Sequence, residues 1–213
     1  MHILTLIRLS VVALAVNWIA VPAFAQSNLC LNCNGPADID VLFFGGVMTD
    51  GDFPGWSMVP LAAPLEEEYL IGAAINREFA DLGKGFHLGG ELGVAGRFGD
   101  STSAEFWAGP SLRHDGFKVG PVQVSFGLVM GLSVVTAPTE LEQSVEDSNP
   151  GGDATLLYYL GPEIAVTFDR YPNLEFVFRT HHRSGAKNLS YLPTLGNMPD
   201  TSNANIFGVR TRF

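Results

Sequence analysis

The sequence predicts an all-β protein, an eight-stranded antiparallel transmembrane β-barrel that follows a cleaved N-terminal signal peptide. Three observations support this fold class. Segments of about 10 residues alternate apolar and polar side chains, as barrel strands do when one face contacts lipid. No uncharged apolar run of about 18 residues follows the N-terminal segment, which excludes a bundle of membrane-spanning helices. Only 16% of the residues are charged and 24 are glycine, so the chain is apolar enough for a membrane, where a closed barrel satisfies every backbone polar group.

The N-terminal segment has the pattern of a secretory signal peptide. Arg8 precedes an apolar run over residues 9–20, and Pro22-Ala23-Phe24-Ala25-Gln26 follows. The run is too short for a spanning helix, so we expect cleavage after Ala25. The expected organisation is a signal peptide over residues 1–25, a periplasmic segment over 26–37 and the barrel over 38–213.

Two cysteines, Cys30 and Cys33, lie in Cys-Leu-Asn-Cys within the periplasmic segment. A thioredoxin-like redox motif requires a βαβ setting, which the sequence does not offer here. We interpret the two residues as a disulfide or as an idle pair in the oxidising periplasm.

Period-two alternation identifies the eight strands. The expected ranges are 38–49, 69–79, 86–98, 103–113, 121–136, 156–168, 173–184 and 203–213. The clearest is 121–136, where Val124, Leu128 and Leu132 share a lipid face and Gln123 and Ser133 share a lumen face. Long loops over 50–68, 137–152 and 185–202, with a short one over 99–102, alternate with turns at 81–84, 114–120 and 169–172. Such barrels place the short turns in the periplasm and the long loops outside.

The net charge of −10 argues against nucleic acid as a partner, because phosphate binding needs a basic surface. Two acidic clusters are assigned to outer loops: Glu66–Glu68, and a second group of Glu140, Glu142, Glu146, Asp147 and Asp153. Further charged residues fall on lumen faces: Glu91, Glu105, Glu163 and Glu175 with Arg97, Arg179, Arg210 and Arg212, beside His87, His181 and Gln123. Buried charges persist only when paired, so these predict a plug of ion pairs in a non-conducting barrel, with a selective pore as the alternative.

The last residues alternate and end on an aromatic side chain, in Ile206-Phe207-Gly208-Val209-Arg210-Thr211-Arg212-Phe213. This is typical of the terminal strand that the outer-membrane assembly machinery recognises. We therefore expect the protein in the bacterial outer membrane.

The strand over residues 173–184 changes character toward its end. Its lipid face continues from Phe178 into His182 and Ser184, which are two residues apart and so lie about 6–7 Å apart along one face. A serine deprotonated by a neighbouring histidine can attack an ester. The alternative is an interfacial polar pair that ends the strand. His181 points to the opposite face from His182, so we expect no shared metal ion, and the sequence calls for no cofactor.

At these residues the sequence resembles the outer-membrane lipid A 3-O-deacylases of the PagL type, the acyloxyacyl-hydrolase-like family. The resemblance covers about the last 40 residues and rests on two motifs. These are His181-His182-Arg183-Ser184-Gly185-Ala186, and Ser202-Asn203 followed by a strand that ends in Arg210-Thr211-Arg212-Phe213.

The resemblance implies a Ser/His/acid triad on the outer surface that removes the ester-linked 3-hydroxyacyl chain of lipid A without a metal. His182 would be the general base and Ser184 the nucleophile, while Asn203 occupies the position of the family's Glu and Asp200 lies nearby as a substitute. The backbone N–H of Gly185 would serve as oxyanion donor.

The implied partners are lipopolysaccharide and the outer membrane. Arg183 and Lys187 would attract lipid A phosphates or anchor the barrel to lipopolysaccharide. The alternative function is a non-catalytic small barrel with a structural or adhesive role. The sequence leaves open the preferred acyl chain, the choice between monomer and homodimer, and the role of Trp56 and the first long loop.

Overall fold

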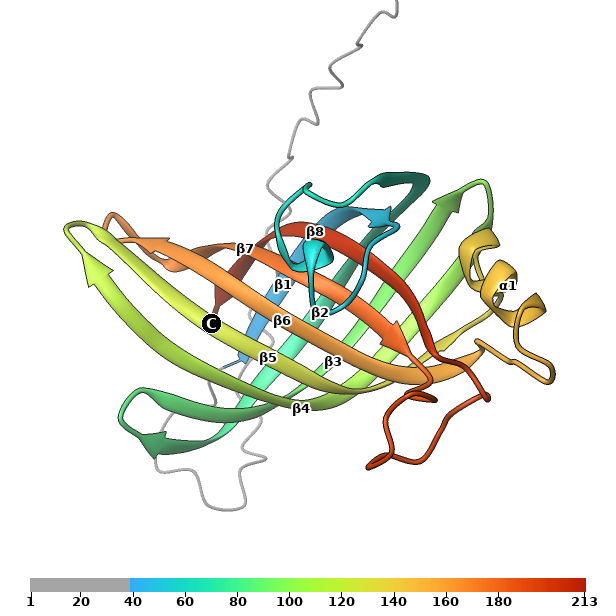
Figure 1. Ribbon diagram of the computed structural model, residues 1–213. Helices are drawn as coiled ribbons and strands as arrows, with labels where there is room; N and C mark the ends of the chain where they lie inside the picture. Colours follow the sequence, from blue (N-terminus) through green and yellow to red (C-terminus); the bar gives the residue numbers. More distant parts are fainter. Residues whose placement is uncertain (1–38) are drawn as a thin grey trace, which may run out of the picture. The chain divides into compact units, whose positions relative to one another are not determined.

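The computed structural model describes residues 39–213, which form a closed barrel of eight antiparallel strands (Figure 1). In chain order these are β1 (Ile39–Thr49), β2 (Leu65–Gly83), β3 (Phe86–Gly99), β4 (Thr102–Val119), β5 (Val122–Val135), β6 (Leu156–Phe168), β7 (Tyr171–Ser184) and β8 (Asp200–Arg212). Strand β8 pairs with β1, which closes the wall. The predicted eight-stranded barrel is therefore confirmed. The predicted signal peptide, the segment 26–37 and both Cys30 and Cys33 lie outside the described residues.

The predicted strand boundaries agree best at β6 and worst at β2 and β4. Strand β6 spans the predicted residues 156–168, whereas β2 begins at Leu65 and β4 continues to Val119. The prediction assigned Glu66–Glu68 to a loop and residues 114–120 to a turn, because their side chains break the apolar alternation. Both assignments were wrong, because backbone pairing continues beyond the apolar part of the wall, where polar side chains meet water.

The outside of the wall is apolar, and the inside carries polar and small side chains. On β5, Met130 and Leu132 are exposed, whereas the alternating Val129 and Ser133 are buried. This is the predicted lipid face and lumen face. Within residues 39–213, no helix has the length and apolar character needed to cross a membrane.

Ion pairs fill the middle of the lumen. Arg179 makes hydrogen bonds of 2.6 and 2.8 Å to Glu91 and of 3.0 and 2.7 Å to Glu163. Arg210 connects Glu163 with Glu175 through bonds of 2.6–2.7 Å. All five side chains are almost fully buried, so each charge is compensated inside the barrel. The predicted pairing of luminal acids with arginines is confirmed here.

Luminal glycines provide the space for this network. A Cβ at Gly93 would lie 2.0 Å from the ring of Trp107, and one at Gly127 would lie 2.6 Å from the carboxylate of Glu163. An eight-stranded barrel has an interior just wide enough for its side chains, so large residues on one strand require small ones on the facing strand.

A second cluster closes the lumen at the end that carries the long loops. There the helix α1 (Glu140–Asp147) begins at a capping box between Thr139 and Glu142. Glu142 was predicted to lie in a solvated acidic loop, but its carboxylate is buried and accepts hydrogen bonds from Arg97, at 2.6 Å, and from Arg183. Burial raises the pKa of this carboxyl, but the guanidinium groups of Arg183 and Arg97 outweigh that effect and hold it below its ordinary value.

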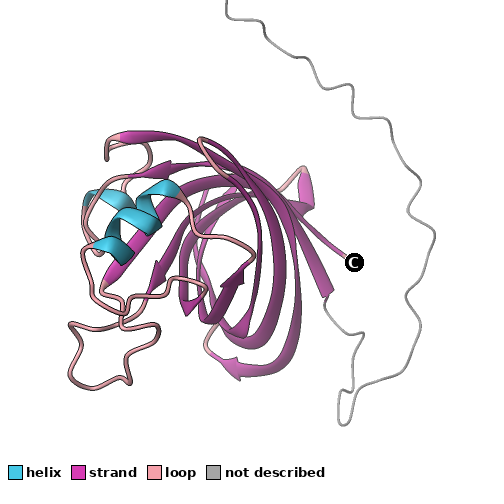
Figure 2. Cartoon of the chain, turned by 90° about the vertical axis from the view of Figure 1, so that its right-hand side faces the viewer, coloured by secondary structure: helices cyan, strands magenta, loops and turns pink. Residues whose placement is uncertain are grey.

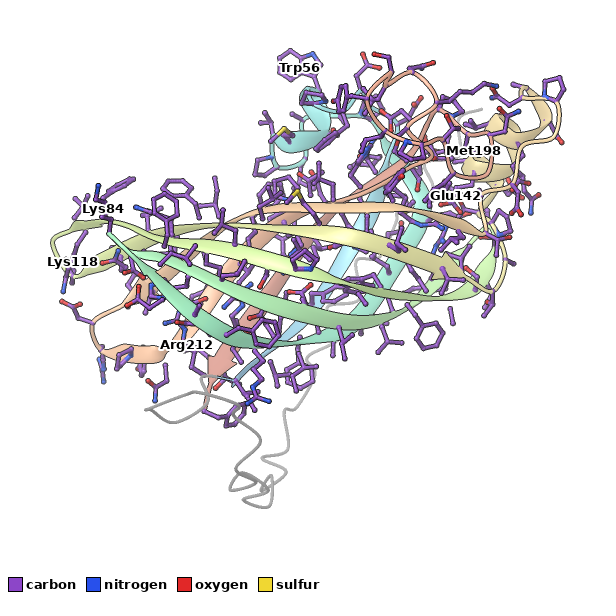
Figure 3. The ribbon with its side chains drawn as sticks, turned by 90° about the horizontal axis from the view of Figure 1, so that it is seen from below. Trp56, Lys84, Lys118, Glu142, Met198 and Arg212 are labelled. Carbon is purple, nitrogen blue, oxygen red and sulfur yellow. The ribbon has the colours of Figure 1, made fainter. Side chains whose placement is uncertain are left out.

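The two ends of the barrel differ in their connections. Figure 2 views the barrel from the end that carries α1, which we call the loop end. In Figure 3, Glu142 and Met198 lie at this loop end, whereas Lys84 and Lys118 lie at the opposite end, where the turns are short. Long loops at one end and tight turns at the other are the arrangement that the sequence predicted.

Candidate active site on the outer wall

The outward side chains of β7 and β8 change from apolar to polar toward the loop end. The pair Phe178 and Phe207 is followed along the wall by three further register pairs: Thr180 with Asn205, His182 with Asn203, and Ser184 with Asp200. The three candidate residues predicted from the sequence, His182, Ser184 and Asn203, therefore lie in one patch on the outside of the barrel. The expected adjacency of the start of β8 and the end of β7 is confirmed.

The ring of His182 is oriented by Asn203. Its Nδ1 lies 2.7 Å from Oδ1 of Asn203, while Nδ2 of the same amide donates to the backbone carbonyl of Gly51 at 2.7 Å. The carbonyl oxygen of Gly51 can only accept a hydrogen bond, so the NH₂ end of the Asn203 amide faces Gly51 and its oxygen faces the histidine. That oxygen, Oδ1, can also only accept. Nδ1 must therefore carry the hydrogen, which leaves Nε2 of neutral His182 with a free lone pair.

A carboxylate also lies within reach of this histidine. Oδ1 of Asp200 is 3.4 Å from Nδ1 of His182, and the Asp200 side chain is partly exposed. The sequence placed Asp200 in a loop as a substitute for the missing acid, and the structure places it at the first position of β8. Asn203 and Asp200 thus face the same nitrogen, the amide from the buried side and the carboxylate from the exposed side.

Ser184 lies at the end of β7 and makes its hydrogen bonds locally. Its Oγ donates to the carbonyl of Pro199 at 3.3 Å and accepts from the backbone N–H of Ala186 at 3.1 Å. Among the described residues, no hydrogen bond joins Ser184 to His182. The two side chains share a strand face, as predicted, but the nucleophile candidate is turned toward the β7–β8 connection.

Two residues assigned to the site from the sequence have other roles. The backbone N–H of Gly185 donates to the carbonyl of Pro199 at 2.9 Å, so it is already engaged, and its role as an oxyanion donor stays a prediction. Arg183 does not face lipid A phosphates, because it is buried in the lumen with Glu142. Strand alternation explains this, since Arg183 lies on the opposite face from His182 and Ser184. Lys187 remains exposed, with Nζ 3.1 Å from Oδ1 of Asn149.

His181 and His182 face opposite sides of the wall, as predicted. Nε2 of His181 lies 2.8 Å from Glu105 inside the lumen, whereas His182 faces Asn203 outside. No group of three potential metal ligands comes together anywhere in residues 39–213.

The sequence did not reveal that the first long loop covers this patch. We call residues 50–64 the cover loop; it contains a short 3₁₀ helix, η1 (Trp56–Met58), which contacts β7 and β8. In Figure 1 it lies against β8. The ring of Phe53 stacks on His182 with 4.0 Å between centroids, and His182 is only 6% exposed as a result. The outward direction of His182 was predicted correctly, but a protein loop covers the ring.

The cover loop is bound through residues that the sequence reading passed over. Asn205 donates to the carbonyl of Ser57 at 2.8 Å and accepts from the N–H of Leu61 at 2.7 Å, and Thr180 donates to the same Ser57 carbonyl at 3.1 Å. Polar residues at consecutive lipid-facing positions of two neighbouring strands were the available signal, because such positions are normally apolar.

No protein-family model matches this sequence, and no curated protein matches it in a sequence search. Solved structures do match it in fold. The outer membrane enzyme PagL aligns with a TM-score of 0.55 at 9% identity, covering 81% of this chain and 98% of PagL. Neisserial surface protein A (NspA) aligns with a TM-score of 0.50 at 11% identity, covering 83% of this chain and 97% of NspA.

These neighbours are outer-membrane barrels, and one of the two is described as an enzyme. The closed wall, its apolar outer surface and this shared fold make the chain an eight-stranded barrel of the bacterial outer membrane. In barrels of this class the long loops lie outside the cell, so we expect the candidate site at the outer side of the membrane.

Proposed function

We propose that this protein is an outer-membrane serine esterase that hydrolyses the ester-linked 3-hydroxyacyl chain of lipid A at the outer leaflet. The observation that carries the proposal is the hydrogen-bond chain from Gly51 through Asn203 to Nδ1 of His182. It sets the tautomer that a general base needs, on the strand face that also carries Ser184.

In the proposed reaction, Nε2 of His182 takes the proton of the Ser184 hydroxyl while Oγ attacks the ester carbonyl carbon. The tetrahedral intermediate collapses with cleavage of the bond to the sugar oxygen, and His182 returns the proton to that oxygen. Water, deprotonated by His182, then attacks the acyl-Ser184 ester; the bond from the acyl carbon to Oγ breaks, His182 returns the proton to Oγ, and the fatty acid is released. Asn203 holds the ring, and the carboxylate of Asp200 stabilises the imidazolium that forms in each step.

Substrate binding must change two features of the resting site: Phe53, which covers the ring of His182, has to move aside, and Ser184 has to turn. Its Oγ has to exchange the carbonyl of Pro199 for Nε2 of His182, and catalytic hydrogen bonds often tighten in this way only in the substrate complex. The N–H of Ala186 already lies 3.1 Å from Oγ, beside the position where an oxyanion would develop. It replaces Gly185 as the candidate donor.

The position of the patch fits a lipid substrate. Phe178 and Phe207, with 5.2 Å between ring centroids, continue the apolar wall directly below Thr180 and Asn205. An acyl chain that lies along the wall would bring its ester to the level at which the wall becomes polar. The exposed Lys187 lies three residues beyond Ser184, where a cation would attract a lipid phosphate.

The decisive experiment is mass spectrometry of lipid A from cells that express the protein. We expect the wild type to remove one 3-hydroxyacyl chain and Ser184→Ala to leave lipid A intact. Ser190→Ala, a matched replacement of an exposed serine in the β7–β8 connection, should behave as the wild type. Identical acylation in cells with wild-type protein and cells without it would refute the proposal.

A second function is favoured by one observation. The hydroxyl of Ser184 is bonded to Pro199 and not to His182, as expected of a polar residue that simply ends a strand. On this basis the alternative is a non-catalytic barrel with a structural or adhesive role, and NspA, a surface protein by name, shares the fold. Intact lipid A together with loss of surface attachment on deletion of the gene would favour it.

A further inference from the structure

The cover loop has two sides of opposite character. Its inner side is bound to the polar patch through Gly51, Ser57 and Leu61, as described above. Its outer side presents large apolar side chains to the surroundings: Trp56, which is 70% exposed, with Met58, Val59 and Leu61. In Figure 3 the ring of Trp56 points away from the strands.

The charge pattern of the loop matches this division. Residues 53–64, Phe-Pro-Gly-Trp-Ser-Met-Val-Pro-Leu-Ala-Ala-Pro, contain no charged side chain. Acidic residues flank the segment on both sides, Asp50 and Asp52 before it and Glu66–Glu68 after it. The connection that holds α1 differs in this respect, because it carries several acids. A loop surrounded by water would have no reason to exclude charges from 12 consecutive residues while exposing a tryptophan.

The loop also lies on the part of the wall that faces the membrane. Its contacts are with outward residues of β7 and β8, immediately above Phe207, which is itself exposed on the apolar wall. The exposed apolar side chains of the loop therefore lie on the same side of the barrel as Phe207, beyond the polar pair Thr180 and Asn205 to which the loop is bound. Amphipathic segments with aromatic and aliphatic residues on one face lie in the membrane interface with that face among the acyl chains.

We propose that the cover loop dips into the outer leaflet and binds its acyl chains through Trp56, Met58, Val59 and Leu61. The polar patch of β7 and β8 is then the docking surface for the inner side of the loop. At this level of the wall the cover loop, and not the strands, contacts the lipid. The acidic residues on both flanks mark where the chain leaves the apolar region. This lipid contact does not depend on the proposed esterase. For the proposed esterase, the same contact places an acyl chain beside the cover loop, whose Phe53 covers His182.

Trp56 itself is the probe for this proposal. The protein purified from membranes is reconstituted in phosphatidylcholine vesicles whose acyl chains carry bromine, a short-range quencher, and in unbrominated vesicles. The difference between the wild type and Trp56→Phe isolates the emission of Trp56 from that of Trp107, which is enclosed in the lumen. In the Trp56→Phe background, Phe207→Trp supplies a lipid-facing reference and Lys118→Trp a reference at the water-exposed turn end.

We expect brominated lipid to quench Trp56 to an extent comparable with the Phe207→Trp reference, and iodide in the water to quench it little. Val59→Lys should reduce the lipid quenching, and Val59→Leu should not. Strong iodide quenching without lipid quenching would overturn the proposal. Protection of Trp56 that appears only at high protein-to-lipid ratio would also overturn it, in favour of a contact between two copies of the chain. Ser184→Ala should leave all these readouts unchanged, which separates the lipid contact from hydrolysis.

Discussion

His181 and His182 are neighbours in β7, yet they have partners of different kinds. Inside the barrel, His181 faces the carboxylate of Glu105 within a network of compensated charges. Outside it, His182 faces the neutral amide of Asn203, and the nearest carboxylate, Asp200, lies at the exposed end of the patch. The difference follows from the surroundings, because the closed lumen supplies counterions from every side, whereas the outer wall supplies a single carboxylate near His182, that of Asp200 at the exposed end of the patch. A neutral amide can orient a histidine there at lower cost than a buried carboxylate.

The largest effect should come from separating the two histidines. We expect His182→Ala to lower hydrolysis by about 10³-fold or more, since both the base and the proton donor are lost, while the barrel keeps its stability. His181→Ala should do the opposite, retaining hydrolysis and losing about 1–3 kcal/mol because Glu105 loses a buried partner. Lipid A turnover and urea unfolding in vesicles measure the two effects. Equal loss of activity in both variants would show that the two faces of β7 do not act independently.

The inner network should depend strongly on Arg179. Replacing Arg179 with Leu leaves Glu91 without its bidentate partner and removes two hydrogen bonds from Glu163, so we expect a loss of about 3–5 kcal/mol. Lys118→Ala, which breaks the exposed 2.6 Å pair with Asp169, is the control and should change stability little. The midpoint of urea unfolding gives the comparison, and similar shifts for the two variants would contradict the importance of burial.

The roles of Asn203 and Asp200 can be separated by their charge. If Asn203 sets the tautomer, Asn203→Ala should lower kcat by roughly 10²-fold. Asp200→Asn should lower it less, because the tautomer is still fixed and only the stabilisation of the imidazolium is lost. Asn203→Asp still offers an acceptor to the same nitrogen but cannot donate to the Gly51 carbonyl, so we expect it to retain more activity than Asn203→Ala while weakening the attachment of the cover loop. A larger loss from Asp200→Asn than from Asn203→Ala would make Asp200 the orienting residue.

The smallest effect concerns the attachment of α1 at the loop end. The pKa of Glu142 is lowered in the folded protein, so its ion pairs with Arg97 and Arg183 stabilise the fold above the ordinary carboxyl pKa and weaken as pH falls below it. We expect the opening free energy over residues 139–147, obtained from hydrogen exchange after correction for the intrinsic rate at each pH, to fall by less than about 1 kcal/mol between pH 7 and pH 4 and further below pH 4. Glu142→Gln should exchange rapidly at both pH values, and unchanged protection of the wild type would contradict this account.

The sequence predicts the barrel because the information for it is local. Alternation along 156–168 and 121–136 requires only a residue and its neighbours two positions away, and β5 and β6 agree with the prediction within two residues. The same rule placed His182 and Ser184 outside and His181 inside. Some local information was missed: Thr139-Glu140-Leu141-Glu142 is a capping-box sequence, which could have predicted the start of α1.

The sequence by itself thus determined which face of each strand is apolar, the number and order of the strands, and that a histidine and a serine share an outward face. Only the tertiary structure decided how those residues are used. The contacts between Gly51 and Asn203, Phe53 and His182, and Glu142 and Arg183 join residues far apart in the chain. They depend on closure of the barrel, which brings β1 beside β8, and on the path of loops whose own sequence has no period. Alternation specifies the wall, whereas long-range closure specifies what covers it and which side chains meet on it.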